Sequence, residues 1–135
     1  MTPRTETMKL ASVRLVTNEL DRLASFYELL TAVAATRLTP DFAEIRLDGA
    51  ILAIGTERTI QQFNASAASA AANRSAIIEL QVADVDAVRS RLGDAPIEHV
   101  MPPTNMPWGN RSMLLRDPDG TLVNVFSRAV VACGA

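Results

Sequence analysis

The sequence contains two similar segments, and this internal repeat limits the possible folds more than any other feature. The segment 12–25, SVRLVTNELDRLAS, resembles the segment 77–90, IIELQVADVDAVRS, with corresponding positions 65 residues apart. Further on, LDGAILAI at 47–54 is matched by PDGTLVNV at 118–125, which lies 71 residues later. A repeat of this length contains a whole supersecondary unit, so we expect two copies of one unit packed together.

Hydrophobic periodicity assigns the same order of elements to both copies. An alternating strand comes first, then an amphipathic helix at 19–32 for which Asn18 provides the N-cap, then three short strands. In the second copy Asp84 caps the helix and Gly93 follows its end. A longer loop, 102–110, accounts for the larger second offset. The predicted strands are 10–17, 33–39, 42–47 and 50–55 in the first copy, and 76–82, 97–101, 111–116 and 121–127 in the second.

These patterns predict an α+β fold of two tandem βαβββ modules within one compact domain. The modules span 9–63 and 76–128, and the small, polar segment 64–75 links them. We expect 1–8 and 129–135 to be flexible tails. Each sheet has one face under a helix and one free face, and two such sheets side by side form a curved mixed sheet around a cavity.

Composition argues against several classes of partner. The chain of 135 residues has a formal net charge of −2, and its 13 Lys and Arg residues form no basic stripe, so we expect no nucleic-acid partner. No apolar run reaches the roughly 20 residues that a membrane span needs. The single Cys133 has no disulfide partner within the chain, which indicates a reducing compartment, and we expect a cytoplasmic protein.

Two charged residues, Arg14 and Glu79, occupy equivalent strand positions in the two modules. Burial under a helix would be costly for either charge, so we place both on the free faces, where they line the cavity. Arg14 suits a carboxylate or phenolate, and Glu79 suits an amine or hydroxyl or acts as a general base. Alternatively, the two form an ion pair that joins the modules. Gln81 and Asn124 either orient a ligand or satisfy backbone groups.

Several other residues have both a functional and a structural interpretation. Trp108 lies in a proline-rich loop that forms either a lid over an apolar ligand or a small core of its own. His99, the only histidine, is assigned a structural role ahead of a catalytic one. Glu44 and Arg46 share one strand face, which is either solvated or lines the cavity. Turn chemistry alone accounts for Asp117 and for the Asp-Gly pair that follows it.

Two motifs point to a known superfamily. The helical segment LDRLASFYELL, 20–30, and the later segment PWGNRSMLLRDPDGTLVNVF, 107–126, together resemble the vicinal oxygen chelate proteins. These include glyoxalase I, extradiol dioxygenases and the bleomycin-resistance binding proteins. The resemblance covers residues 9–128. It implies paired βαβββ modules that form a U-shaped sheet around a ligand cavity, and it suggests a homodimer.

The resemblance also implies where a metal would be held, because the superfamily uses His and Glu side chains on the first and last strands of each module. The corresponding positions here are Ser12, Ala53, Ile77 and Asn124. Ala53 and Ile77 have no donor atom, whereas a transition-metal site needs several imidazole, carboxylate or thiolate donors. We therefore expect no metal and no other cofactor.

The resulting prediction is a metal-free protein that binds a small organic molecule in the cavity between the modules. The predicted ligand-binding residues are Ser12, Arg14, Glu79, Gln81, Trp108 and Asn124. The alternative is a metal-independent enzyme of lyase, isomerase or hydrolase type, with Glu79 as acid/base and Arg14 as oxyanion partner. A metal-dependent glyoxalase or dioxygenase is the third possibility.

Overall fold

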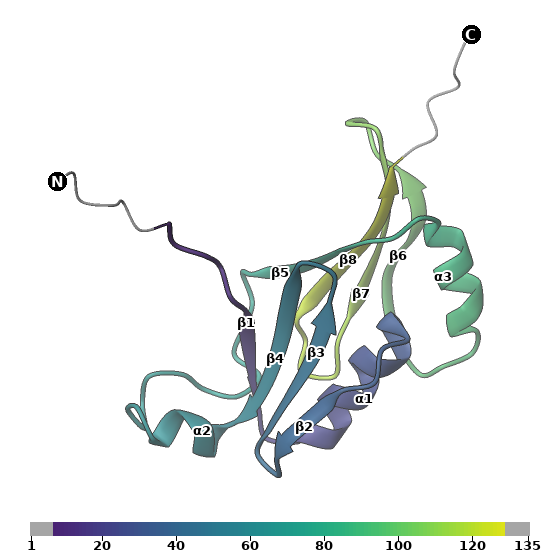
Figure 1. The fold of residues 1–135 in the computed structure, drawn as a ribbon. Helices are drawn as coiled ribbons and strands as arrows, with labels where there is room; N and C mark the ends of the chain where they lie inside the picture. Colours follow the sequence, from purple (N-terminus) through teal and green to yellow (C-terminus); the bar gives the residue numbers. More distant parts are fainter. Residues whose placement is uncertain (1–6, 129–135) are drawn as a thin grey trace, which may run out of the picture.

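The computed structural model describes residues 7–128 and contains two four-stranded sheets, one from each repeat (Figure 1). Cys133 and the predicted tail 129–135 lie outside the described residues. The strands of the first repeat are β1 (Val13–Thr17), β2 (Thr36–Thr39), β3 (Phe42–Leu47) and β4 (Ala50–Thr56). Those of the second are β5 (Ile77–Gln81), β6 (Glu98–Asn105), β7 (Asn110–Arg116) and β8 (Leu122–Arg128). The helices are α1 (Leu20–Thr31), α2 (Glu57–Gln61) and α3 (Val85–Leu92).

The two sheets have the same topology. Strand order is β1-β4-β3-β2 in the first, which we call sheet 1, and β5-β8-β7-β6 in the second, sheet 2. In each sheet the first strand of the repeat runs parallel to the last strand, and the other pairs are antiparallel. The predicted α+β class with two βαβββ modules is therefore confirmed. The edge strands are β1 and β2 in sheet 1 and β5 and β6 in sheet 2.

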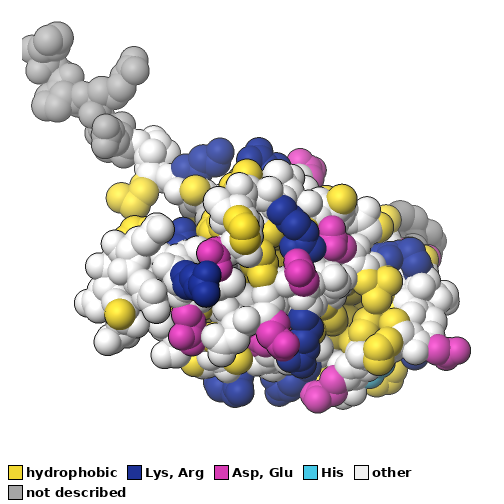
Figure 2. Space-filling model, turned by 90° about the horizontal axis from the view of Figure 1, so that it is seen from below, with side chains coloured by type: hydrophobic (Ala, Val, Ile, Leu, Met, Phe, Trp, Pro, Cys, Tyr) yellow, Lys and Arg dark blue, Asp and Glu magenta, His cyan; other side chains and the backbone are white. Residues whose placement is uncertain are grey.

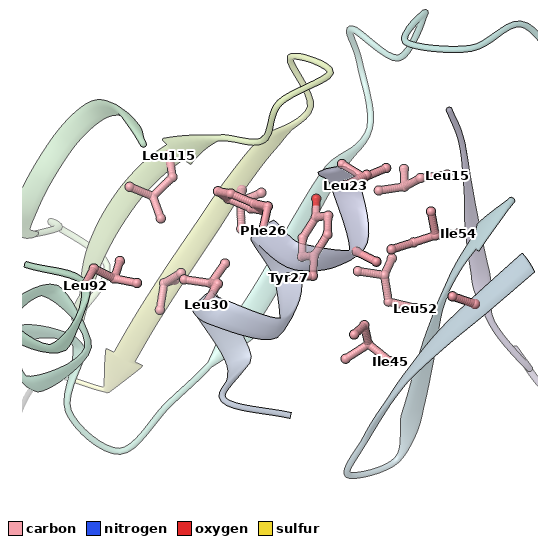
Figure 3. Close-up of a cluster of buried hydrophobic side chains, with 14 of the residues drawn as sticks. Leu15, Leu23, Phe26, Tyr27, Leu30, Ile45, Leu52, Ile54, Leu92 and Leu115 are labelled. Carbon is pink, nitrogen blue, oxygen red and sulfur yellow. The ribbon is translucent and has the colours of Figure 1, made fainter. Parts of the chain in front are cut away.

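Helix α1 lies between the two sheets and fills the space between the modules (Figures 1 and 3). Leu23 lies beside Leu15 of sheet 1, whereas Phe26 lies toward Leu115 of sheet 2. All four belong to one buried cluster that also includes Leu92 of α3. Each buried side chain of this size contributes about 1.5–3 kcal/mol. Within residues 7–128 the two sheets are separate, with no hydrogen-bonded ladder between them.

Local differences from the predicted elements have simple causes. Helix α1 begins at Leu20 after an N-cap at Glu19 rather than Asn18, and the Thr17 hydroxyl accepts from the Glu19 amide at 3.1 Å. The short helix α2 was not predicted. Strand β6 continues through Pro102 and Pro103 to Asn105, because an edge strand tolerates residues that donate no ladder hydrogen bond. The predicted cap of α3 is confirmed, since Asp84 accepts from two backbone amides at 3.0 and 3.2 Å.

Polar contacts tie α1 to the second module. The Arg91 guanidinium of α3 donates to the carbonyl oxygens of Leu29 and Leu30, both at 2.7 Å. These carbonyls lie in the last turn of α1, where intrahelical donors are missing. At the other side of the interface, the Tyr27 hydroxyl donates to Asp117 Oδ2 at 2.7 Å. Together these bonds hold the second module against the helix of the first.

Charged side chains of both signs are mixed on the surface. On the face seen in Figure 2, basic and acidic side chains lie next to one another rather than in a patch of one sign. Within residues 7–128, no helix combines the length and the apolar character required to cross a bilayer.

Candidate functional site

Each sheet has one face against the shared core and one face turned away from it. Because side chains alternate along a strand, Leu15 and Ile54 face the core while Arg14 and Ala53 face outward. We call the outward faces of sheets 1 and 2 open face 1 and open face 2. Since both sheets turn their other face toward α1, open faces 1 and 2 of one chain point away from each other (Figure 3).

Open face 1 is organised around Arg14 at the sheet edge. Its guanidinium lies over the ring of Phe42, 5.0 Å from the centroid, and over that of Phe63 at 5.8 Å. Cation–π contacts of this kind contribute about 0.5–1 kcal/mol each when exposed, and they fix the position of the cation. Arg14 is paired with Ala53 and Ala53 with Glu44, and we call such a set of residues paired across the strands a row. In this row, the Glu44 carboxylate accepts a hydrogen bond of 3.0 Å from Arg46. Glu44 is the more buried partner, with 15% side-chain exposure against 63% for Arg46.

Open face 2 is organised around Glu79 on β5. Its Oε2 accepts a hydrogen bond of 2.9 Å from Asn124 Nδ2, and the two residues are paired in the β5–β8 register. Asn124 is in turn opposite Leu114 of β7. The next row contains Gln81, Phe126 and Ser112. This face is therefore apolar in part, with an acidic group at its edge.

The structure does not bring the two predicted charges together within one chain. Among residues 7–128, neither Arg14 nor Glu79 forms an ion pair. Arg14 stacks on aromatic rings and Glu79 bonds to an amide, so an ion pair between them does not join the modules of one chain. The partner rings were missed by sequence reasoning, because Phe63 follows the unpredicted α2.

The other candidate residues are dispersed. Ser12 is exposed and directly precedes β1, and Gln81 lies beside the Glu79 row. Trp108 is 71% exposed in the β6–β7 turn, so it forms no small core under its own loop. His99 lies on β6, where partial burial and, secondarily, the charge of Arg89 lower its pKa.

Of the cavities that are lined by both modules, two contain one of the predicted charged residues. The larger, of about 680 Å³, lies along β5 and is lined by Glu79, Gln81 and the β3–β4 turn. The smaller, of about 250 Å³, lies between β1 and the linker, and its lining includes Arg14 and Asp119. Arg14 and Glu79 therefore line different cavities.

Asp117 has a structural role beyond its turn. The residue is 4% exposed, and its Oδ1 accepts from the amides of Asp119 and Thr121 at 2.8 and 3.0 Å, as turn chemistry predicts. Its Oδ2 accepts from Tyr27, 90 residues earlier. Burial raises the pKa of Asp117, and the hydrogen bonds that the carboxylate accepts oppose this rise. For the Tyr27 phenol, burial and then the negative charge of Asp117 raise the pKa, so it stays a donor.

This arrangement of modules matches known proteins. The sequence profile described as the Glyoxalase/Bleomycin resistance protein/Dioxygenase superfamily matches residues 9–125. The chain belongs to this superfamily. No curated protein sequence matches the chain.

Several solved structures share the fold. A glyoxalase/bleomycin resistance protein/dioxygenase from Nocardioides has 22% identity and a TM-score of 0.74, over 98% of this chain and 91% of that one. A family enzyme from Burkholderia phytofirmans PsJN has 13% identity and a TM-score of 0.76, with coverage of 90% and 99%. TioX from Micromonospora sp. ML1 has 21% identity and a TM-score of 0.67, with coverage of 87% and 97%. At these identities the likeness concerns the fold.

The residues at the superfamily's metal-binding positions do not fit a transition metal. Ala53 and Ile77 offer no donor atom, Ser12 offers a neutral hydroxyl, and Asn124 already donates to Glu79. Within residues 7–128, no three His, Cys, Asp or Glu side chains lie close enough to hold an ion together. This donor set lacks the imidazole and carboxylate ligands that such metals require.

Proposed function

We propose that the protein is a metal-free homodimer that binds a small organic molecule between open face 1 of one copy and open face 2 of the other. One observation carries this proposal. Arg14 and Glu79 have opposite charges, occupy equivalent positions of the repeat, and are each on an edge strand without an ionic partner in residues 7–128. Within residues 7–128 the two side chains line different cavities, so we assign their contact to a second copy.

A two-fold axis satisfies both edges at once. If β1 of one copy lies beside β5 of the other, symmetry creates the same contact a second time, so the β1 and β5 edges of both copies are covered, while β2 and β6 remain edge strands. Apolar side chains on these edges support the contact, since Val13 is 42% exposed and Ile77 is 49% exposed. Arg14 of one copy then lies near Glu79 of the other, at the floor of a joint cavity.

The joint cavity has the composition of a ligand site. Open face 1 contributes the rings of Phe42 and Phe63, and open face 2 contributes Leu114 and Phe126. Mostly apolar walls with a few polar groups are typical of sites for small organic molecules. We assign the charged and amide groups of both faces to ligand orientation, with Ser12, Gln81 and Trp108 as further candidates around the site.

Charge reversal tests the dimer. We expect Arg14→Glu and Glu79→Arg each to weaken the dimer, and the double variant to restore it, because the reversed charges again attract. Light scattering coupled to size-exclusion chromatography measures the mass. The control is Asp94→Arg, which makes the same charge change at an exposed position between α3 and β6. A wild-type protein that is monomeric at high concentration contradicts the proposal.

Ligand binding is tested by thermal shift with small aromatic acids, amines and antibiotics. A ligand present at a hundredfold excess over its Kd stabilises the folded state by about 2.7 kcal/mol. We expect Arg14→Ala to lose the shift while it remains folded. Elemental analysis provides the second readout, and a stoichiometric transition metal in the purified protein would refute the metal-free assignment.

A further inference from the structure

We infer that Ser112, Asn124 and Glu79 form a recognition site for the ammonium group of an organic amine. This inference rests on the proposed function, because it names the ligand class of the same site. Its starting point is a pair of buried polar atoms on open face 2, Ser112 Oγ and Asn124 Oδ1. Neither atom has a hydrogen-bond partner among residues 7–128.

Ser112 is the more unusual of the two. It is 4% exposed, and it lies on the open side of β7, opposite Phe126, while its neighbour Met113 faces the core. A buried hydroxyl without a partner is destabilising, because no hydrogen bond offsets its removal from water. An alanine would avoid this cost in the free protein, and a hydrogen-bonding partner from outside the chain would account for the hydroxyl.

Asn124 presents an acceptor because its amide orientation is determined. A carboxylate only accepts hydrogen bonds, so the nitrogen of Asn124 faces Glu79 Oε2 at 2.9 Å. The amide oxygen of Asn124, Oδ1, therefore has no hydrogen-bond partner among residues 7–128. Asn124 pairs with Leu114, and Ser112 lies two residues away on the same strand, so the two polar side chains are diagonal neighbours on one face.

The site then offers acceptors from three side chains, whereas an ammonium group offers three donors and no acceptor. The negative charge of Glu79 complements the cation and disfavours a carboxylate at the same place. The other charged groups on this face are Arg116 and Glu98, which pair at 3.5 Å, and Arg128 at the end of β8. Arg116 also donates to the Gly120 carbonyl at 3.0 Å.

The apolar neighbours of this cluster complement the rest of such a ligand. Leu114, Phe126 and Met101 occupy the same and adjacent rows of open face 2, and all three are partly exposed. They are placed to contact a hydrocarbon or aromatic body attached to the ammonium group. The ligand class is therefore an amine with an apolar body rather than a polyamine or an organic acid.

Three probes with one ring test the assignment: benzylamine, benzyl alcohol and benzoate. We expect benzylamine at millimolar concentration to bind the dimer more tightly than the other two by calorimetry. Ser112→Ala should weaken benzylamine binding about tenfold, which is the effect of one charge-assisted hydrogen bond. The same variant should leave the melting temperature of the free protein unchanged or raised, because it removes an unpartnered hydroxyl.

Ser127→Ala is the matched control. Ser127 is also a buried serine, on β8, but its hydroxyl accepts from the Val85 amide at 3.4 Å on the core side. We expect this variant to lower the melting temperature and to leave benzylamine affinity unchanged. A second affinity variant, Glu79→Gln, keeps the side-chain shape and should weaken benzylamine but not benzyl alcohol.

The outcomes that overturn the inference are distinct from those that overturn the proposed function. Benzoate or benzyl alcohol binding as tightly as benzylamine, or no benzylamine binding at all, rejects the amine site even where the charge-reversal variants confirm the dimer. If Ser112→Ala weakens the ligand-free dimer, the hydroxyl bonds to the second copy and the inference fails. If the charge-reversal variants do not behave as expected, the proposed dimer is rejected, and the amine site is judged by the benzylamine measurements.

Discussion

The hydrogen bond between Tyr27 and Asp117 joins the first module to the second, and its removal should destabilise the whole fold. Tyr27→Phe deletes the hydroxyl that donates to Asp117 Oδ2 at 2.7 Å and leaves a carboxylate oxygen without that donor at a residue that is 4% exposed. Hydrogen bonds to charged groups contribute about 1.5–3 kcal/mol, so we expect a loss of about 2 kcal/mol in the free energy of unfolding. For 135 residues this corresponds to a fall of about 7 °C in Tm.

The loss should depend on pH with a definite sign. Burial raises the pKa of Asp117 in the folded state above its value in the unfolded chain. The folded state therefore binds this proton more tightly, and the resulting stabilisation is present at acid pH and is lost as pH rises through the raised pKa. The Tyr27 hydroxyl favours the ionised form, so Tyr27→Phe should cost more at pH 7 than near pH 3, which lies below the raised pKa of Asp117.

Urea unfolding at the two pH values measures both effects. Asp117→Asn keeps the side-chain shape and the acceptor for the turn amides, and it should remove the pH dependence that Asp117 contributes. The double variant completes a thermodynamic cycle, in which we expect a coupling of at least about 1 kcal/mol at pH 7. A cost for Tyr27→Phe below about 0.5 kcal/mol, or the same cost at both pH values, would refute this reasoning.

Two further changes act on α1. Ala32 ends this helix with a left-handed φ of 59°, so Ala32→Gly should raise the free energy of unfolding by about 1 kcal/mol. Ala34 has no positive φ, so Ala34→Gly should lower the free energy of unfolding. Urea unfolding of both variants tests this prediction. Arg91→Ala removes the two donors to the last-turn carbonyls of α1 and should cost about 1–2 kcal/mol. Arg91→Lys should recover only part of this loss, because an ammonium lacks the planar pair of N–H donors of a guanidinium. Full recovery of stability by Arg91→Lys in thermal unfolding would contradict the role of the two hydrogen bonds.

The modules could be predicted from the sequence because their signals are local. Alternating strands, an amphipathic helix and Asp-Gly turns recur in both copies, and the Asp84 cap and the positive φ of 54° at Gly93 are where the sequence placed them. The boundaries that differ depend on context that periodicity does not contain. Glu19 replaces the expected Asn18 as the N-cap of α1, with its amide bonded to the Thr17 hydroxyl. Helix α2 carries too few apolar residues to show a helical stripe.

The contacts of the candidate site could not be predicted in the same way, because they join residues far apart in the chain. Turn chemistry explains one oxygen of Asp117 completely, so nothing in the sequence indicates that the other oxygen bonds to Tyr27. The stack of Phe42 and Phe63 on Arg14 likewise depends on how α2 returns over the edge of sheet 1. Polarity and position within the repeat identified Arg14 as a candidate, but they did not reveal its neighbours.

The opposite signs of Arg14 and Glu79 also bear on how two copies would pair. Two-fold symmetry permits β1 to lie beside the same strand of the other copy, or beside β5. The first arrangement places Arg14 against Arg14, and a β5–β5 contact places Glu79 against Glu79, so both are opposed by like charges. Only the mixed contact brings opposite charges together, and it covers the β1 and β5 edges of both copies. A duplicated unit with identical charges would not distinguish these arrangements, so the divergence of the two repeats itself favours a site shared between copies.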